Sequence, residues 1–345
     1  MEFTKPLQFA SAIVAATTLL MYTNILPTTA GNILLVLLFL VLYLLFNAKR
    51  NGFSLISLIP ITIALGIVII NKDPSLVSLA LIWVLYDIFN NATYDAPNIA
   101  KSFFITGIIG YIIILAAYFA FGLNKHADLE MWRINKMIMR SSLGFQQPNT
   151  SMMYALALVM SMIIAYKMTW FKSIVTLLTV FGLYHFNQSR TSFILIILVV
   201  MMNQLRRSLP WPKVIFVITG ITSYLLLTLP LNPQLNDLLS GRISLYKSYT
   251  ALQGIHLLAN PLVENTMLDN SYIQMLLSKG VLFTIVFFIS ILIILKTKTT
   301  TSRILVLAYI LSAFTETTFL HFDLLFPVLL VSNTVFKGEL NNDIT

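Results

Sequence analysis

The sequence predicts an all-helical integral membrane protein, and its composition, its apolar runs and the placement of its basic residues all favour this fold class. Hydrophobic residues make up 58% of the 345 residues and charged residues only 10%. A soluble domain has about 25% charged residues, because charge must cover its surface. The composition therefore excludes the soluble globular and disordered classes.

Apolar runs follow one another along the whole chain, and a helix needs about 20 apolar residues to cross a bilayer. No convincing cleavage site follows the first run, so we interpret it as a span and not as a signal peptide. The sequence predicts one polytopic membrane domain, residues 1–345, with about twelve spans. The runs lie near 7–23, 31–46, 53–70, 74–90, 102–122, 149–166, 171–187, 191–205, 213–229, 271–295, 304–320 and 322–336.

The basic residues predict the orientation. The net charge of +9 is first explained by positive cytoplasmic loops and not by a nucleic-acid partner. Placing Arg206, Arg207 and the cluster at 296–303 inside puts both termini in the cytoplasm. Nine basic residues then remain outside, namely Lys72, Lys125, Arg133, Lys136, Arg140, Arg190, Arg242, Lys247 and Lys279.

Two long outer loops are predicted, at 123–147 and 230–270, and they hold most of these nine residues. Long loops in a compact protein are usually functional or disordered, and aromatic residues such as Trp132 and Tyr249 argue against disorder. Residues 241–258 have helical periodicity with Ser240 as an N-cap. This pattern predicts a short helix lying on the outer membrane surface.

Motifs for ATP, dinucleotide and serine-nucleophile chemistry are absent from the sequence. The chain has no Cys, and its four His residues show no metal-ligand spacing. We therefore expect no cofactor and no metal. The substrate must arrive already activated, or move down a gradient.

The strongest polar motif is Asn187 to Ser192, which lies between two apolar runs at the outer boundary. The guanidinium of Arg190 suits a phosphate or carboxylate, so this motif, with Gln188 and Ser189, is a candidate anchor for an anionic ligand. Alternatively, Arg190 extends to the interface or pairs with a buried acid.

A second motif, Ser240 to Arg242, opens the expected surface helix, which also carries Tyr246 and Lys247. A cation beside the backbone N–H groups of a helix start makes an anion site. The alternative is an ordinary solvated Arg242 near lipid headgroups.

A third motif, Leu268 to Tyr272, lies where the second outer loop re-enters the membrane. Asp269, next to Asn270, is a candidate general base or a group that orients a sugar hydroxyl. The alternative is that Asp269 caps the following helix.

A fourth motif runs from Arg140 to Asn149 and ends the first outer loop, to which Arg133 adds positive charge. The alternative is a structured loop with solvated charges. Glu316 lies inside the eleventh apolar run, where an acid is a functional candidate or a partner for one of the arginines.

In this order, over roughly residues 130–320, these motifs resemble the O-antigen polymerase and ligase superfamily, and most of all the repeat-unit polymerases of bacterial capsule and exopolysaccharide clusters. The resemblance implies a membrane glycosyltransferase (GT-C-like) bundle with a long outer loop over the active site. It implies transfer of a polyprenyl-diphosphate-linked glycan onto another glycan, without metal or nucleotide, at the outer face of the bacterial cytoplasmic membrane. Expected partners are lipid-linked oligosaccharide, membrane lipids, a chain-length regulator and a flippase.

The resemblance also implies residue roles. Arg190 and Arg242 match the diphosphate-binding arginines, and Asp269 stands where the ligase branch carries His. The remaining motif residues are expected to bind substrate: Arg133, Arg140, Asn149, Gln188, Ser189, Tyr246, Lys247, Tyr272 and Glu316. Arginines near a leaving diphosphate stabilise its charge, which agrees with the reading of the residues themselves. Two alternatives stay open: a ligase that moves finished glycan, and a lipid-glycan flippase or secondary transporter.

Overall fold

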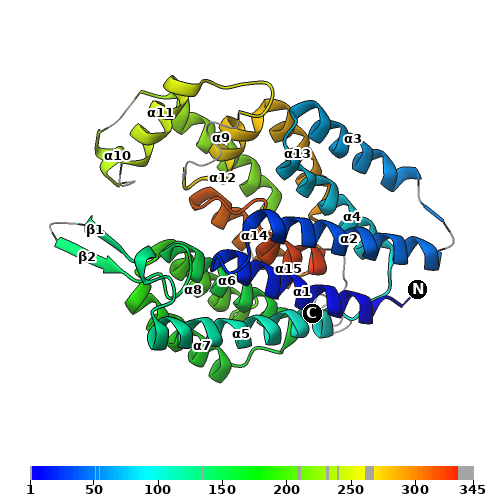
Figure 1. Cartoon of the computed structure of the whole chain (residues 1–345), viewed down its shortest axis with the longest axis horizontal. Coiled ribbons are helices and arrows are strands. Elements are labelled where there is room, and N and C mark those ends of the chain that lie inside the picture. Colours follow the sequence, from blue (N-terminus) through cyan, green and yellow to red (C-terminus); the bar gives the residue numbers. More distant parts are fainter. Residues whose placement is uncertain are drawn as a thin grey trace.

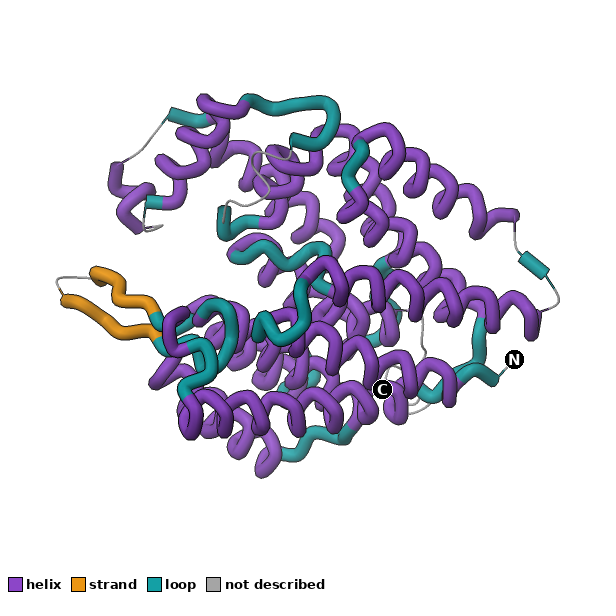
Figure 2. The backbone as a smooth tube through the Cα atoms, in the orientation of Figure 1, coloured by secondary structure: helices purple, strands orange, loops and turns teal. Residues whose placement is uncertain are grey.

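The computed structural model describes residues 2–50, 52–53, 55–133, 136–207, 211–230, 233–238, 241–260 and 268–332. The secondary structure of the described chain is helical, apart from one two-stranded hairpin (Figures 1 and 2). The elements are α1 (Thr4–Tyr22), α2 (Thr28–Arg50), α3 (Leu55–Asn71), α4 (Val77–Asn91), α5 (Ala96–Phe121), β1 (Leu129–Arg133), β2 (Lys136–Arg140), α6 (Pro148–Ala165), α7 (Trp170–Asn187), α8 (Arg190–Gln204), α9 (Pro212–Thr228), α10 (Pro233–Leu238), α11 (Arg242–Gln253), α12 (Ser271–Gln274), α13 (Gly280–Ile294), α14 (Thr300–Thr315) and α15 (Phe322–Ser332).

Each of the twelve apolar runs coincides with a helix of the described chain, the tenth being α12 and α13 joined by a π-helical segment, Met275–Lys279. Four helical stretches are long and apolar enough to cross a membrane: Thr28–Arg50, Ala96–Phe121, Pro148–Ala165 and Ser271–Ile294. An all-helical membrane protein is therefore the fold class. The count of twelve spans and the glycosyltransferase bundle stay predictions.

Local sequence explains where several helices begin and end. Asp95 caps α5 by accepting from the backbone N–H of Asn98, and α5 stops at Gly122, whose φ of 72° is left-handed. Thr299 and Ser302 form a reciprocal capping box at the start of α14. Such caps satisfy backbone groups that a helix end leaves unpaired, so each helix stops at a defined residue.

The helices give the molecule two different ends. The hairpin and the helices α10 and α11 lie at one end, on the left of Figure 1, and the N-terminus lies on the right. We call these the loop end and the basic end. At the basic end Arg50 pairs with Asp87 at 3.8 Å, and the ammonium of Lys296 donates to Asn90 at 3.0 Å. The side of the membrane that each end faces stays a prediction.

The core is formed by central helices that are buried on nearly all sides and not on one face only. Every described residue of α15 is buried, and so are most residues of α6 and α14. A helix that is buried on all sides reads as uniformly apolar, which is the pattern of these runs. The outer helices expose large apolar side chains instead, as α2 does with Ile33, Leu37 and Leu44.

The first long loop contains the hairpin, which was not predicted. Strands β1 and β2 pair antiparallel, with Leu129 opposite Arg140 and Arg133 opposite Lys136. Each strand has only five residues, which is too short for an alternation of apolar and polar side chains to be recognised.

The second long loop contains the expected surface helix, but in a shorter form. It was predicted over 241–258, whereas α11 ends at Gln253 because Gly254 adopts a left-handed φ of 71°. Gly241 occupies the N-cap position, and Ser240, the predicted cap, lies outside the described residues. The short helix α10 precedes α11 and was not predicted.

Candidate active site

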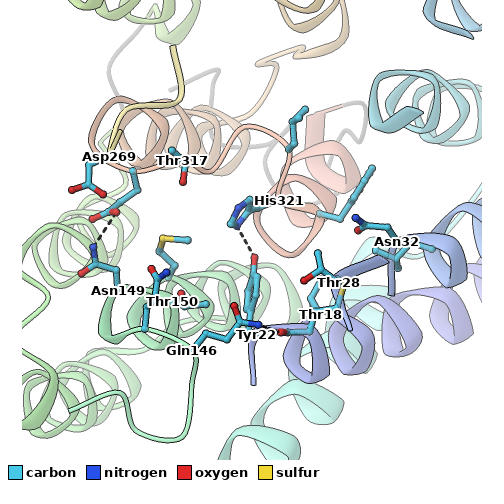
Figure 3. A pocket seen from close by; sticks show the side chains of 17 residues that line it. Thr18, Tyr22, Thr28, Asn32, Gln146, Asn149, Thr150, Asp269, Thr317 and His321 are labelled. Carbon is cyan, nitrogen blue, oxygen red and sulfur yellow. Dashed lines mark hydrogen bonds between the residues drawn. The ribbon is translucent and has the colours of Figure 1, made fainter. Parts of the chain in front are cut away.

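A cavity of about 350 Å³ lies at the loop end of the molecule. Its walls come from α1, α2, the start of α6, the residue Asp269 and the turn 316–322 that joins α14 to α15 (Figure 3). Residues from both predicted loops, from the first two helices and from the turn before the last described helix therefore meet at one site. Asn149, Asp269 and Glu316 line this cavity among the predicted site residues.

Glu316 is the most perturbed acid that lines the cavity. It was expected inside an apolar run, but α14 ends at Thr315 and Glu316 is its extended C-cap, in the turn outside the helix. Burial, and next the nearby Asp269 carboxylate, raise the pKa of Glu316 to about 8, while Arg242 and Arg140 act against the rise. At neutral pH Glu316 is therefore largely protonated and can donate a hydrogen bond.

Asp269 and Arg242 form an ion pair with 3.0 Å between the guanidinium Nη2 and the carboxylate Oδ2. Their side chains are 31% and 29% exposed, so water and ligands can reach both. Asp269 has a left-handed φ of 46°, and the cap of the following helix is Asn270, whose Oδ1 accepts from the N–H of Ile273. The alternative of Asp269 as an N-cap is therefore wrong, and its carboxylate remains with Arg242.

A second cationic group approaches Glu316 through one amide. The buried Arg140 donates from Nη2 to Oδ1 of Asn149 at 2.5 Å and from Nε to the carbonyl of Asn187 at 3.2 Å. Asn149 in turn donates from Nδ2 to Glu316 Oε2 at 3.2 Å and accepts from the hydroxyl of Ser189. Four predicted site residues, one from strand β2, one from helix α6 and two from turns that flank α8 and α14, thus form one connected network.

Arg190 does not belong to this network. It is the first residue of α8, it is exposed, and the described part of the chain gives it no hydrogen bond or ion pair. Its pairing with a buried acid, one alternative for this residue, is therefore not found among the described residues. The neighbouring Ser189 does reach Asn149, so the backbone holds Arg190 beside the network while its side chain points to the exterior.

Five other predicted residues lie outside the lining of the cavity and have contacts within the fold. Tyr272 is buried among Phe216, Phe288 and Phe319, and its hydroxyl shares a 2.7 Å hydrogen bond with Thr219. Asn270 is buried, and its amide donates to Ser223 at 3.1 Å. Tyr246 and Lys247 of α11 and Gln188 at the end of α7 also lie away from the cavity walls, with the following contacts: Tyr246 is buried, Lys247 bonds the carbonyl of Leu229, and Gln188 bonds the carbonyl of His185. The side chain of Arg133 lies outside the described part of the chain.

The cavity also contains residues that the sequence did not indicate. The hydroxyl of Tyr22 donates to Asp323 Oδ1 at 2.8 Å. The same hydroxyl lies 2.6 Å from Nδ1 of His321 (Figure 3). Because the hydroxyl has one proton, Nδ1 is the donor in the second bond and Nε2 is left as an acceptor. Burial lowers the pKa of His321 to about 4, so the ring is neutral.

No local pattern could have joined these residues, because Tyr22 and His321 are separated by 299 positions. The only available indication was that a His and an Asp close one short turn at 321–323. In the described chain, no three His, Asp or Glu side chains come together as metal ligands.

Comparisons with protein-family models, with curated proteins and with solved structures returned no match. The fold and site therefore define a class on their own evidence: a helical membrane protein with a partly charged cavity at one end. The cavity wall holds the protonated Glu316 and the carboxyl group of Asp269. Arg242 pairs with Asp269, and Arg140 is linked to Glu316 through Asn149. Such a set can bind an anion, accept a proton and donate one.

Proposed function

We propose that this protein polymerises polyprenyl-diphosphate-linked oligosaccharide repeat units at the outer face of a bacterial cytoplasmic membrane. The observation that carries the proposal is that two acids of the cavity wall, Asp269 and Glu316, are each connected to an arginine. Asp269 pairs with Arg242, and Glu316 is linked through Asn149 to Arg140. Cations aimed at a leaving diphosphate stabilise the charge that develops in the transition state. A carboxylate beside them supplies the proton acceptor that an attacking hydroxyl requires.

In the proposed reaction, a sugar hydroxyl of one repeat-unit glycan attacks the anomeric carbon of another. The new carbon–oxygen bond forms as the bond between that carbon and the diphosphate oxygen breaks, and the bonding electrons leave with the polyprenyl diphosphate. The hydroxyl proton passes to Asp269. Arg242 leaves Asp269 and binds the diphosphate, and the exposed Arg190 is a second cation available to it. One direct displacement inverts the anomeric configuration.

The test is the length of lipid-linked glycan in cells that carry Arg242→Ala. We expect single repeat units on the carrier and no long chains, because the leaving diphosphate loses its main cation. Lys125→Ala removes an exposed outer cation away from the cavity and is the matched control, which should make normal polymer. Normal chain length from a stably expressed Arg242→Ala protein would overturn the proposal. Long polymer retained on the carrier would instead indicate a ligase.

A further inference from the structure

Five polar side chains that line the cavity make no hydrogen bond with a residue that the structure describes: Thr28, Asn32, Gln147, Thr150 and Thr317. Other polar groups of the same walls are bonded within the fold. Thr18 donates to the carbonyl of Val14, and Gln146 donates to the carbonyl of Met21. The five free groups are therefore donors and acceptors that face a ligand space without an internal partner.

These free groups extend across the cavity. Figure 3 shows Asp269, Asn149 and Thr150 on one side, Tyr22 and His321 in the middle, and Thr28 and Asn32 on the opposite side. None of the five carries a charge, and His321 is neutral with an Nε2 acceptor. The acids of the lining, Asp269 and Glu316, are confined to the first side. The acids thus lie on one side of the cavity, whereas uncharged hydrogen-bonding groups lie on both sides, and we call these groups its neutral part.

The neutral part matches one ligand chemistry best. Hydroxyl and amide groups each donate and accept, which suits the paired donor and acceptor capacity of sugar hydroxyls. The partly exposed ring of Tyr22 adds an apolar face among them. A volume of about 350 Å³ lies within the roughly 300–1,000 Å³ of small-ligand sites. Phosphate or carboxylate ligands find no cation among the lining residues of this part.

We infer that the five uncharged groups of the cavity walls, Thr28 and Asn32 of α2 with Gln147, Thr150 and Thr317, form a binding site for the uncharged sugar rings of a glycan. The glycan extends from the side of the cavity that holds the acids toward α2. This inference rests on the proposed function for the role of that side, and it assigns α1 and α2, which lie outside the motif-bearing region, to substrate recognition. Asn32 and Thr28 then determine which sugar is accepted.

The test is saturation-transfer NMR on the purified full chain in detergent, with maltotriose and chitotriose as probes at millimolar concentration. We expect transfer to at least one trisaccharide with the wild-type protein. Asn32→Leu and Thr28→Val should each weaken that binding roughly fivefold, the equivalent of one lost hydrogen bond of about 1 kcal/mol. Asn203→Leu, which removes an amide from α8 at the opposite end, is the matched control and should bind as the wild type does.

Absence of transfer to both trisaccharides, or equal binding by wild type, Asn32→Leu and Thr28→Val, would overturn the inference. Thermal melting establishes that each variant is folded, and Gln147→Leu replaces any variant that is not. Binding of inorganic pyrophosphate, followed in the same samples, should depend on Arg242 and not on Asn32. The two proposals can fail separately. If the purified protein binds sugar but cells that lack it make polymer of unchanged length, the proposed function is wrong and the sugar site stands.

Discussion

Asp269 occupies the place on Arg242 that an anionic ligand would take. The two groups are 3.0 Å apart and both are about one-third exposed, so the pair is screened by water and can be separated. A bound anion therefore competes with the protein's own carboxylate. In the proposed reaction, displacement of that carboxylate frees it to accept the proton of the attacking hydroxyl.

Asp269→Asn is accordingly expected to change binding and turnover in opposite directions. The variant should bind inorganic pyrophosphate severalfold more tightly, since an exposed ion pair of up to about 1 kcal/mol no longer competes. It should also lose polymerisation. Calorimetric titration measures the first effect, and Glu130→Gln, which removes an exposed charge on the hairpin, is the control. Unchanged pyrophosphate affinity in Asp269→Asn would contradict this role.

Glu316 predicts a pH dependence of stability. Its pKa of about 8 in the folded protein lies above the ordinary value of 4.5, because the acid is buried beside Asp269. Between these two pKa values the folded chain holds a proton that the unfolded chain releases. The contribution of protonated Glu316 to the stability of the fold is therefore complete below pH 4.5 and is lost as pH rises through about 8.

Glu316→Gln should remove that loss. The quantity to compare is the melting temperature of the variant minus that of the wild type in the same detergent. This difference should increase by several degrees between about pH 5 and about pH 8.5. The exposed Glu130→Gln should show no such trend. A difference that stays constant across this range would show that Glu316 titrates normally.

The sequence predicted only part of the site at this scale. Contacts between residues that are close along the chain could be expected, and contacts between distant residues could not. Arg140 and Asn149 are neighbours in one motif, so their contact could be expected. Asp269 was identified as an acid of interest, but its pairing with Arg242 depends on how a loop folds back. Tyr22 and Asp323, 301 positions apart, share no local pattern at all.

At the scale of elements, Gly280 fixes the end of the second outer loop against the start of α13. Its φ of 83° and ψ of 164° belong to a region that is essentially restricted to glycine. A Cβ there would lie 2.5 Å from the carbonyl carbon of Leu258. The N–H groups of Val281 and Leu282 bond the carbonyls of His256 and Leu257, which fastens the loop to the helix.

Gly280→Ala should therefore destabilise the protein by about 1–3 kcal/mol from backbone strain alone. The close backbone contact adds to this cost, since a carbonyl cannot rotate away as a side chain can. Gly182→Ala in α7 meets nothing within 4 Å and is the control, expected to melt at or slightly above the wild-type temperature. Equal melting of the two variants would refute the role of Gly280.

The helices that match the twelve apolar runs were predictable from sequence, because each run contains a helix of at least eleven residues. The hairpin was not, because its strands are short and polar groups interrupt them. The end of α14 was also missed. Residues 316–320 continue the apolar run with Phe319 and Leu320, yet the hydroxyl of Ser271 accepts from the N–H groups of Thr318 and Phe319 and holds them in a turn. That tertiary contact overrides the local pattern.

At the scale of the whole molecule, the loop end and the basic end predict a fixed orientation in the membrane. The chain has no Cys, so single cysteines can be introduced without background. Ser248→Cys in α11 should react with a membrane-impermeant maleimide in intact spheroplasts. Lys298→Cys, at the opposite end, should react only after permeabilisation. Labelling of both positions, or of Lys298→Cys alone, in intact spheroplasts would contradict the orientation.

The cavity has a consequence for synthesis of the chain. Tyr22 is made early, but its partners His321 and Asp323 follow about three hundred residues later, with every intervening helix to be inserted first. Contacts so distant in sequence form late, because the entropy of ordering the intervening chain must be lost before these contacts can stabilise the fold. A partly inserted chain therefore lacks the cavity wall that residues 316–322 supply, and the cavity is completed only when the last helices are inserted.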